Sequence, residues 1–154
     1  VSIGVDGAAS NEAADMISET HSAWLMQRAR AGEGAVAEHR GGKGEAMAAA
    51  TATVEDVVRW GTAGGAAVLG LPAIGTLAVG QAADLAIYGL DRDPRYFGLH
   101  DPAIGPVACG GRADLRLLLV GGKPVVRNNS IPDLDLHDLS RQAQSAVQRL
   151  LARL

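Results

Sequence analysis

Asp6 is the first residue along the chain whose type and position suit catalysis. It directly follows residues 1–5, in which Val1, Ile3 and Val5 alternate with small residues and predict a short buried strand. In barrel enzymes, catalytic side chains stand at the carboxyl ends of strands, because these ends open onto one shared pocket. A carboxylate there can ligate a metal ion and accept a proton from water. Because an Asp followed by Gly is also a common turn pair, a purely structural role for Asp6 stays open.

The other residues able to ligate a metal or act as nucleophiles form no recognisable motif. The four histidines are His21, His39, His100 and His137. They are widely separated and lack His-x-His spacing, so we expect surface or packing roles for them. The single cysteine, Cys109, excludes an internal disulfide and a zinc ribbon, fits a reducing cytoplasm, and is expected to be a small apolar side chain.

The segment after Asp6 is expected to be a loop that leads into a long helix. Apolar residues with helical spacing begin after Glu12 and continue to about Arg30. Ser10 or Asn11 is the expected N-cap of this helix, although either could instead contact a substrate. Residues 32–50 are rich in Gly, Ala and Glu, and predict a mobile loop with one short helical turn.

Two short helices are expected between Thr53 and Gly70. Thr53 and Asp56 have the spacing of a capping box, in which each side chain bonds the other residue's backbone N–H. The two helices should be separated near Gly61 and Thr62. The second should end at Gly70, because glycine readily adopts the left-handed conformation of a helix end.

The later part of the chain predicts strands and a closing helix. Residues 85–88, 115–120 and 123–127 are strand-like, and the last two segments are joined by Gly121 and Gly122, a two-residue hairpin signature. Apolar residues of the segment 138–154 fall on one helical face. This tail is therefore expected to be an amphipathic helix.

Composition limits the class of protein. The chain has 154 residues, 47% of them hydrophobic and 20% charged, which is typical of a packed domain rather than a disordered one. A complete (β/α)8 barrel needs ~250 residues, so any barrel here must be incomplete. A formal net charge of −3 without a basic stripe argues against nucleic-acid binding, and apolar runs such as 66–74 are too short for a membrane span. Because the chain starts at Val1 within a strand-like run, we expect it to be cut from a longer protein.

Three segments together resemble the amidohydrolase superfamily, in particular its cytosine-deaminase-like branch and the 8-oxoguanine deaminase and chlorohydrolase group. Residues 4–11 (GVDGAASN) resemble the family's eighth-strand Asp motif and the loop that follows it. Residues 62–70 are similar to its helix motif AT-x-GGA-x-x-LG, and residues 74–85 to IG-x-L-x-x-G-x-x-ADL. Residues 99–102 and 119–126 extend the similarity.

The resemblance implies an α/β fold, namely the carboxyl-terminal part of a (β/α)8 metal-dependent hydrolase barrel (TIM barrel), part of a small β-sandwich domain and a C-terminal helix. Residues 1–72 would hold the last barrel strand and its helices. Residues 73–132 would form part of the β-sandwich, and residues 133–154 the closing amphipathic helix.

The resemblance also implies an activity for the complete protein. It would hydrolytically deaminate a purine, pyrimidine or triazine-type ring, using a divalent metal, with zinc as the expected ion. Asp6 would be both a metal ligand and the catalytic residue that accepts the proton of the attacking water. The family's histidine ligands would lie upstream of Val1, so we expect the chain alone to be inactive.

The sequence alone leaves two hypotheses for the function open. In the first, the complete enzyme is cytoplasmic and homo-oligomeric, acts on a small heterocycle, and uses neither nucleic acid nor membrane as a partner. In the second, the chain is a non-catalytic interaction or structural module in which Asp6 only closes a turn. An upstream open reading frame that encodes a His-x-His motif on a strand would favour the first hypothesis.

Overall fold

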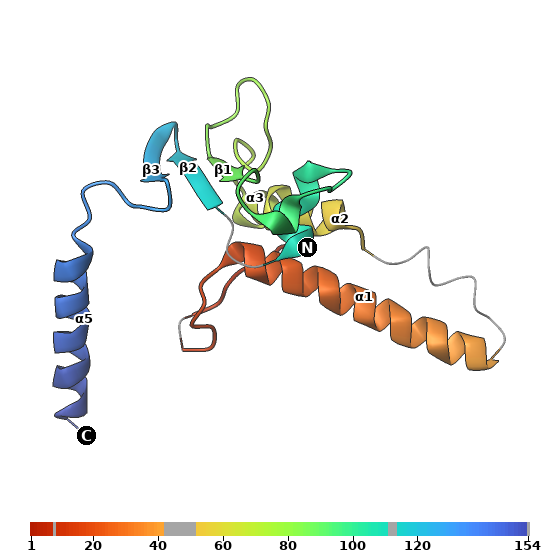
Figure 1. Cartoon of the computed structure of the whole chain (residues 1–154), viewed down its shortest axis with the longest axis horizontal. Coiled ribbons are helices and arrows are strands. Elements are labelled where there is room, and N and C mark those ends of the chain that lie inside the picture. The colour runs from red at the N-terminus through yellow and green to blue at the C-terminus, as the bar shows by residue number, and fades with distance from the viewer. Residues whose placement is uncertain (8, 42–51, 111–113, 154) are drawn as a thin grey trace.

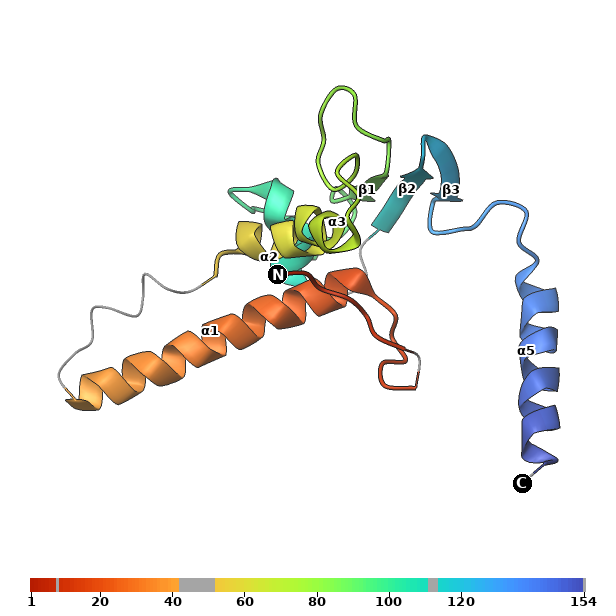
Figure 2. The same cartoon turned by 180° about the vertical axis from the view of Figure 1, so that it is seen from behind.

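The computed structural model describes residues 1–7, 9–41, 52–110 and 114–153, and within the first helix it describes side chains as far as residue 32. Helices and a small antiparallel sheet pack together, and one further helix stands apart from them (Figures 1 and 2). The elements, in chain order, are α1 (Met16–Gly41), α2 (Val54–Gly61), α3 (Ala63–Leu69), β1 (Leu85–Gly89), the short 3-10 turns η2 (Pro94–Tyr96) and η3 (Pro102–Ile104), α4 (Gly105–Cys109), β2 (Asp114–Val120), β3 (Lys123–Arg127) and α5 (Leu136–Leu151).

The strand expected over residues 1–5 is a wrong prediction. Residues 1–7 have no regular secondary structure. The alternating pattern is real, and the side chains of Ile3 and Val5 are half-buried. A strand also needs a hydrogen-bonded neighbour, and among the described residues the sheet consists of β1, β2 and β3 only.

Helix α1 starts later and runs much further than expected. Its cap is Asp15, whose Oδ1 accepts hydrogen bonds from the backbone N–H groups of Ile17 (3.0 Å) and Ser18 (3.5 Å). The helix continues to Gly41, through part of the segment expected to be a mobile loop. This stretch contains Ala, Glu and Arg, which are good helix formers, alongside glycines that each cost about 1 kcal/mol relative to Ala. Residues 42–50 of the expected loop lie outside the described part of the chain.

Helices α2 and α3 form as expected. The capping box is present in full: the Thr53 hydroxyl accepts from the Asp56 N–H, and the Asp56 carboxylate accepts from the Thr53 N–H. Helix α3 ends at Gly70, which has the left-handed φ of 68°.

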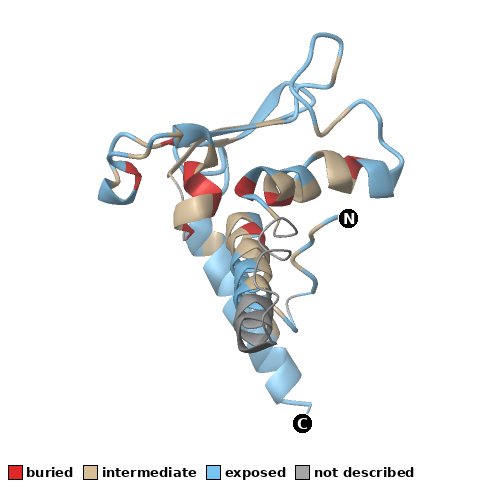
Figure 3. Ribbon diagram, turned by 90° about the vertical axis from the view of Figure 1, so that its right-hand side faces the viewer, coloured by how far each residue is buried: buried red, intermediate tan, exposed pale blue. Residues whose placement is uncertain are grey.

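The core lies where α1, α2 and α4 meet. Val54, Val57 and Val107 are buried there, and Val57 is fully inaccessible. Trp24 of α1 and Trp60 of α2 are among the partly buried side chains packed against them. Figure 3 shows this small buried centre, with most of the surrounding residues partly or fully exposed.

The sheet has the order β1-β2-β3, with both neighbouring pairs antiparallel. Val120 pairs with Lys123 across the link between β2 and β3. Gly121 and Gly122 have φ values of 55° and 77°, the positive values that a type I′ hairpin turn requires at both central residues. The hairpin prediction is therefore confirmed.

Helix α5 is capped by Asp135, whose carboxylate accepts from the N–H groups of His137 and Asp138. It begins slightly earlier than expected and lies apart from the other helices in both views (Figures 1 and 2). Its large apolar side chains are exposed, as the fractions for Leu136 (67%) and Leu150 (63%) show. Among the described residues, no helix is both long enough and apolar enough to span a bilayer.

Candidate active site

Asp6 adopts an unusual backbone conformation and a well-defined side-chain arrangement. Its φ is 61°, in the left-handed region that Asp tolerates better than most residues. Its Oδ1 accepts a hydrogen bond from the N–H of Gly7 (2.7 Å), and its Oδ2 accepts one from the Ser10 hydroxyl (3.0 Å). These bonds, that from Gly7 first, hold the pKa of the Asp6 carboxyl below its usual range. Asp6 is therefore an exposed, ionised carboxylate at neutral pH.

The loop after Asp6 is closed on itself and attached to α1. The backbone N–H groups of Ser10 and Asn11 both donate to the carbonyl oxygen of Gly7, at 2.9 and 3.0 Å. The Asn11 side-chain amide donates to the Glu19 carboxylate on α1 at 2.6 Å. Neither Ser10 nor Asn11 caps α1, so that prediction is wrong. Asp15 caps the helix instead, and its place directly before the first apolar helical residue was the signal for it.

The glycine-rich segment 62–70 lies against the start of the chain. A Cβ atom added to Gly64 would lie only 2.2 Å from the carbonyl oxygen of Val1. Because Gly64 has no side chain, the backbone that leads to Asp6 can approach the beginning of α3 closely. Gly64 therefore has a packing role in this segment.

The segment 74–85 also has a structural role, because it packs on α3 and holds the β2-β3 hairpin. Gly75 has a φ of 85°, and a Cβ there would lie 2.9 Å from Ala63 and Ala66 of α3. Asp84 accepts a hydrogen bond from the N–H of Gly121 at 2.6 Å. Asp84 thus attaches the β2-β3 hairpin to the start of β1, which accounts for an acidic residue at this point of the motif.

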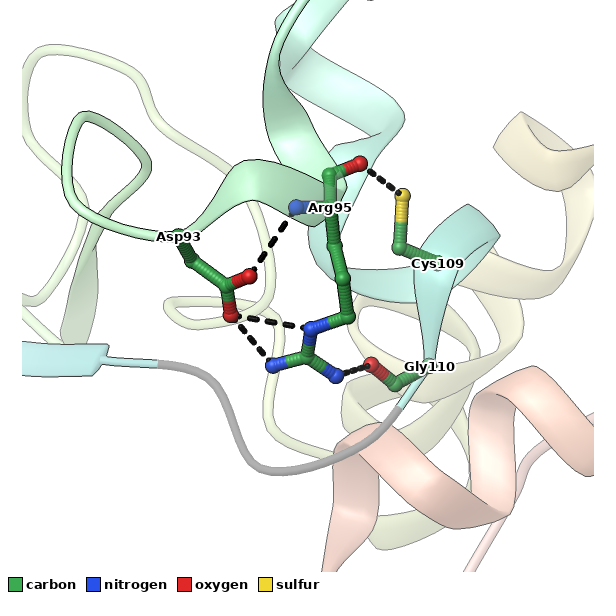
Figure 4. Close-up of polar contacts among 4 residues, drawn as sticks. All are labelled: Asp93, Arg95, Cys109 and Gly110. Atoms are coloured by element: carbon green, nitrogen blue, oxygen red, sulfur yellow. Dashed lines mark hydrogen bonds and ion pairs between the residues drawn. The ribbon is translucent and has the colours of Figure 1, made fainter.

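The end of α4 is held by an arginine-centred group of contacts, drawn in Figure 4. The Arg95 guanidinium donates to the Asp93 carboxylate through Nε (2.9 Å) and to the carbonyl oxygen of Gly110 through Nη1 (2.8 Å). Hydrogen bonds from Arg95 hold the pKa of Asp93 below its usual range. The half-buried Cys109 thiol donates to the Arg95 carbonyl oxygen at 3.2 Å, so this cysteine makes a specific contact rather than only filling space.

A largely apolar cavity of about 780 Å³ lies between the start of α1, the end of α2 and β1. Met16, Val58, Leu77, Tyr88 and Val107 are among the residues that line it. Burial, with a smaller effect from the Asp15 carboxylate, raises the pKa of Tyr88. Asp6 is not part of this lining, so the structure does not bring the candidate catalytic residue to the cavity.

Asp6 suits a metal as one ligand, because an ionised carboxylate is a normal donor to Zn²⁺. Across the described parts of the chain, however, no group of three or more His, Cys, Asp and Glu side chains could hold an ion. The His21 ring is bonded to the carbonyl oxygen of Val107, while His100 and His137 are exposed. The side chain of His39 lies outside the described residues. The described chain therefore contributes a single candidate ligand rather than a metal centre.

Comparison with known proteins shows the family to which this chain belongs. The profile of the Amidohydrolase family matches residues 1–123, well over half of the chain. The chain belongs to the amidohydrolase family. The match includes Asp6, the glycine-rich segment against Val1 and the Asp84 segment at the hairpin.

Several amidohydrolases are similar over nearly the whole chain. Isoxanthopterin deaminase from an unidentified prokaryote is 58% identical over 98% of this chain, and 8-oxoguanine deaminase from Pseudomonas aeruginosa is 37% identical over 99%. An amidohydrolase from a Sargasso Sea environmental sample has a TM-score of 0.79 and 52% identity over 99% of this chain, which spans 31% of that structure. An adenosine deaminase from Xanthomonas campestris, solved with bound zinc, has a TM-score of 0.77 and 26% identity over 98% of this chain and 31% of its own.

The amidohydrolase chain spans 31% of the length of the isoxanthopterin deaminase and 30% of that of the 8-oxoguanine deaminase. The expected fold class, a portion of a barrel-type hydrolase with a small sheet and further helices, is confirmed by these structural matches. The boundaries at residues 72 and 132 and the role of Asp6 stay predictions.

Proposed function

We propose that the chain is part of a metal-dependent amidohydrolase that hydrolytically deaminates an amino-substituted nitrogen heterocycle. The observation that carries the proposal is the 58% identity to isoxanthopterin deaminase over 98% of the chain. The similarity to 8-oxoguanine deaminase and to hydroxydechloroatrazine ethylaminohydrolase supports the broader substrate class. Pterin and purine rings are the first candidates, and pyrimidine and triazine rings come next.

Asp6 is the residue of this chain that we propose to take part in the reaction. A divalent metal, with zinc as the expected ion, would be held in part by Asp6 and supplies a Lewis acid that makes water more acidic. The low pKa of Asp6 keeps it anionic, as a ligand must be. Each carboxylate oxygen retains a free lone pair beyond its hydrogen bond to Gly7 or Ser10. Asp6 would accept a proton from the attacking water and pass it to the departing ammonia.

The remaining parts of the proposal concern the complete protein. Its partner is a small heterocyclic substrate, with neither nucleic acid nor membrane involved, and it works as a homo-oligomer in the cytoplasm. The 154-residue chain alone is inactive, because Asp6 is the only metal ligand that we assign within the described residues.

A non-catalytic module derived from an amidohydrolase is the second candidate. The observation in its favour is that the Asp6 side chain accepts hydrogen bonds from two near neighbours in the sequence, Gly7 and Ser10. A residue that merely closes a turn makes such contacts.

An assay of ammonia release separates the two candidates. The full-length protein, loaded with zinc, should release ammonia from at least one of isoxanthopterin, 8-oxoguanine and isocytosine. The 154-residue chain alone and the zinc-stripped protein are the matched controls, and both should be inactive. Absence of ammonia release from all three rings by the zinc-loaded protein would contradict the proposal and favour the module.

A further inference from the structure

We propose that Ser10 is a positioning residue for Asp6, and that the hydrogen bond between Asn11 and Glu19 holds Ser10 in place. The inference rests on the proposed function, in which Asp6 is a metal ligand and proton acceptor. It assigns a role to two residues whose expected task, the capping of α1, is performed by Asp15.

The Ser10 hydroxyl is placed to hold one specific oxygen of Asp6. Its Oγ lies 3.0 Å from Asp6 Oδ2 and 3.1 Å from the carbonyl oxygen of Gly7. A hydroxyl has one proton to donate. The charged carboxylate is the stronger acceptor of the two, since hydrogen bonds to ionised groups are roughly twice as strong as those between neutral groups.

Two hydrogen bonds, one to each oxygen, fix the plane of the Asp6 carboxylate. The N–H of Gly7 holds Oδ1 at 2.7 Å, while Ser10 holds Oδ2. The rotation of an Asp carboxylate about its last torsion is otherwise broad. Without the Ser10 hydroxyl, only the hydrogen bond from Gly7 to Oδ1 would remain of these two. The carboxylate could then turn about that hydrogen bond. Hydrogen bonds that orient a ligand side chain contribute to metal affinity. A carboxylate that binds a metal therefore works best when its orientation is fixed.

The position of Ser10 is itself set by α1. The N–H groups of Ser10 and Asn11 share the Gly7 carbonyl oxygen as acceptor. The Asn11 side chain donates to Glu19, which is half-buried, and the Glu19 N–H donates to the Asp15 carbonyl oxygen at the start of the helix. Contacts therefore lead without interruption from the first turn of a long helix to the Asp6 carboxylate, and rigid elements place functional groups better than loops do.

Substitution of Ser10 in the full-length protein tests this role. With isoxanthopterin and 8-oxoguanine as substrates, Ser10→Ala should lower kcat about tenfold and leave KM within about twofold, because Asp6 is misdirected while substrate binding is untouched. Ser10→Thr keeps the hydroxyl at an exposed position and should restore kcat. Ser22→Ala, an exposed serine of α1, is the matched control and should behave as wild type.

Two further readouts separate positioning from a general structural defect. In an Asp6→Asn background, Ser10→Ala should cause no additional loss of kcat, because both changes act through the same carboxylate. Loss of zinc to a chelator should be about tenfold faster in Ser10→Ala than in wild type and Ser10→Thr.

The possible results distinguish the two proposals. A wild-type protein that deaminates neither substrate contradicts the proposed function. An active wild type whose kcat and zinc retention are unchanged by Ser10→Ala contradicts only the positioning role of Ser10. Failure of Ser10→Thr to restore kcat would also count against that role.

Discussion

The imidazole Nδ1 of His21 lies 2.7 Å from the carbonyl oxygen of Val107, 86 residues further along the chain. This contact joins α1 to α4. The same ring fills the space beside Gly110, whose carbonyl oxygen is held by Arg95. The first turn of α1 also contacts the loop that carries Asp6. The packing of α4 against His21 therefore helps to fix the position of the helix that supports this loop.

Gly110→Ala should destabilise this junction strongly. The added Cβ would lie 2.6 Å from the His21 ring, and Gly110 has φ 63° and ψ −176°, a region that only glycine adopts easily. We expect a loss of about 3 kcal/mol in the free energy of unfolding, from strain and overpacking together. Urea unfolding of the purified protein measures it.

Gly70→Ala is the matched control for Gly110→Ala. Gly70 also has a positive φ (68°), but a Cβ there would meet nothing within 4 Å. Only the backbone cost of about 1 kcal/mol should remain. Equal losses for the two variants would show that the contact with His21 has no part in the stability of the junction.

Thr53→Ala should weaken the start of α2. It removes the hydroxyl that accepts from the Asp56 N–H, a bond of 3.1 Å, and we expect a loss of about 1 kcal/mol in unfolding free energy. Thr53→Ser keeps the oxygen and is the control, with a loss of less than about half of that. If Ser and Ala prove equally destabilising, the methyl group of Thr53 rather than its hydroxyl supports the helix.

The stabilising effect of Asp56 should disappear in acid. Hydrogen bonds from Thr53, that from its backbone N–H first, hold the pKa of Asp56 below its usual range in the folded chain. A carboxyl whose pKa is lower when folded contributes stability above its unfolded pKa, and this contribution is lost as the pH falls through the folded value. The difference in unfolding free energy between wild type and Asp56→Ala should therefore be larger at pH 6 than at pH 3. A difference that grows toward pH 3 would have the wrong sign.

Features fixed by a few neighbouring residues could be predicted from the sequence. The capping box of Thr53 and Asp56 and the hairpin at Gly121 and Gly122 each depend on contacts within about four residues, and both are present. The strand expected before Asp6 depends instead on a partner strand, which a local pattern cannot supply. The sequence pattern predicts too short an α1, because glycines after Arg30 are typical of a loop, whereas the helix continues through them to Gly41.

The candidate site could be predicted only in part. Asp6 was identifiable as a carboxylate after an apolar run, but its positive φ and its contact with Ser10 were not. Ser and Asn side chains cap helices and close loops with the same hydrogen bonds, so Ser10 and Asn11 fit either task. The choice was decided by Asp15, a competing cap immediately before α1, and by Glu19, which offers Asn11 a better-placed acceptor.

The isolated 154-residue chain should bind zinc weakly, without a saturable one-to-one site. Protein zinc sites use three or four protein ligands, and the described residues contain no cluster of that kind. Calorimetric titration of the purified chain measures this, with the full-length protein as the control that should bind zinc tightly. A tight one-to-one isotherm for the isolated chain would show that it holds a complete site.

The central claim, that Asp6 takes part in the chemistry, is tested most directly by steady-state deamination with Asp6→Asn in the full-length protein. The change preserves size but removes the charge and the basic oxygen. We expect kcat to fall by about 10² or more with little change in melting temperature, while Glu12→Gln, an exposed carboxylate of the same loop, should keep wild-type turnover. Near-normal kcat in the zinc-loaded Asp6→Asn protein would remove Asp6 from the mechanism and leave it as a residue that closes a turn.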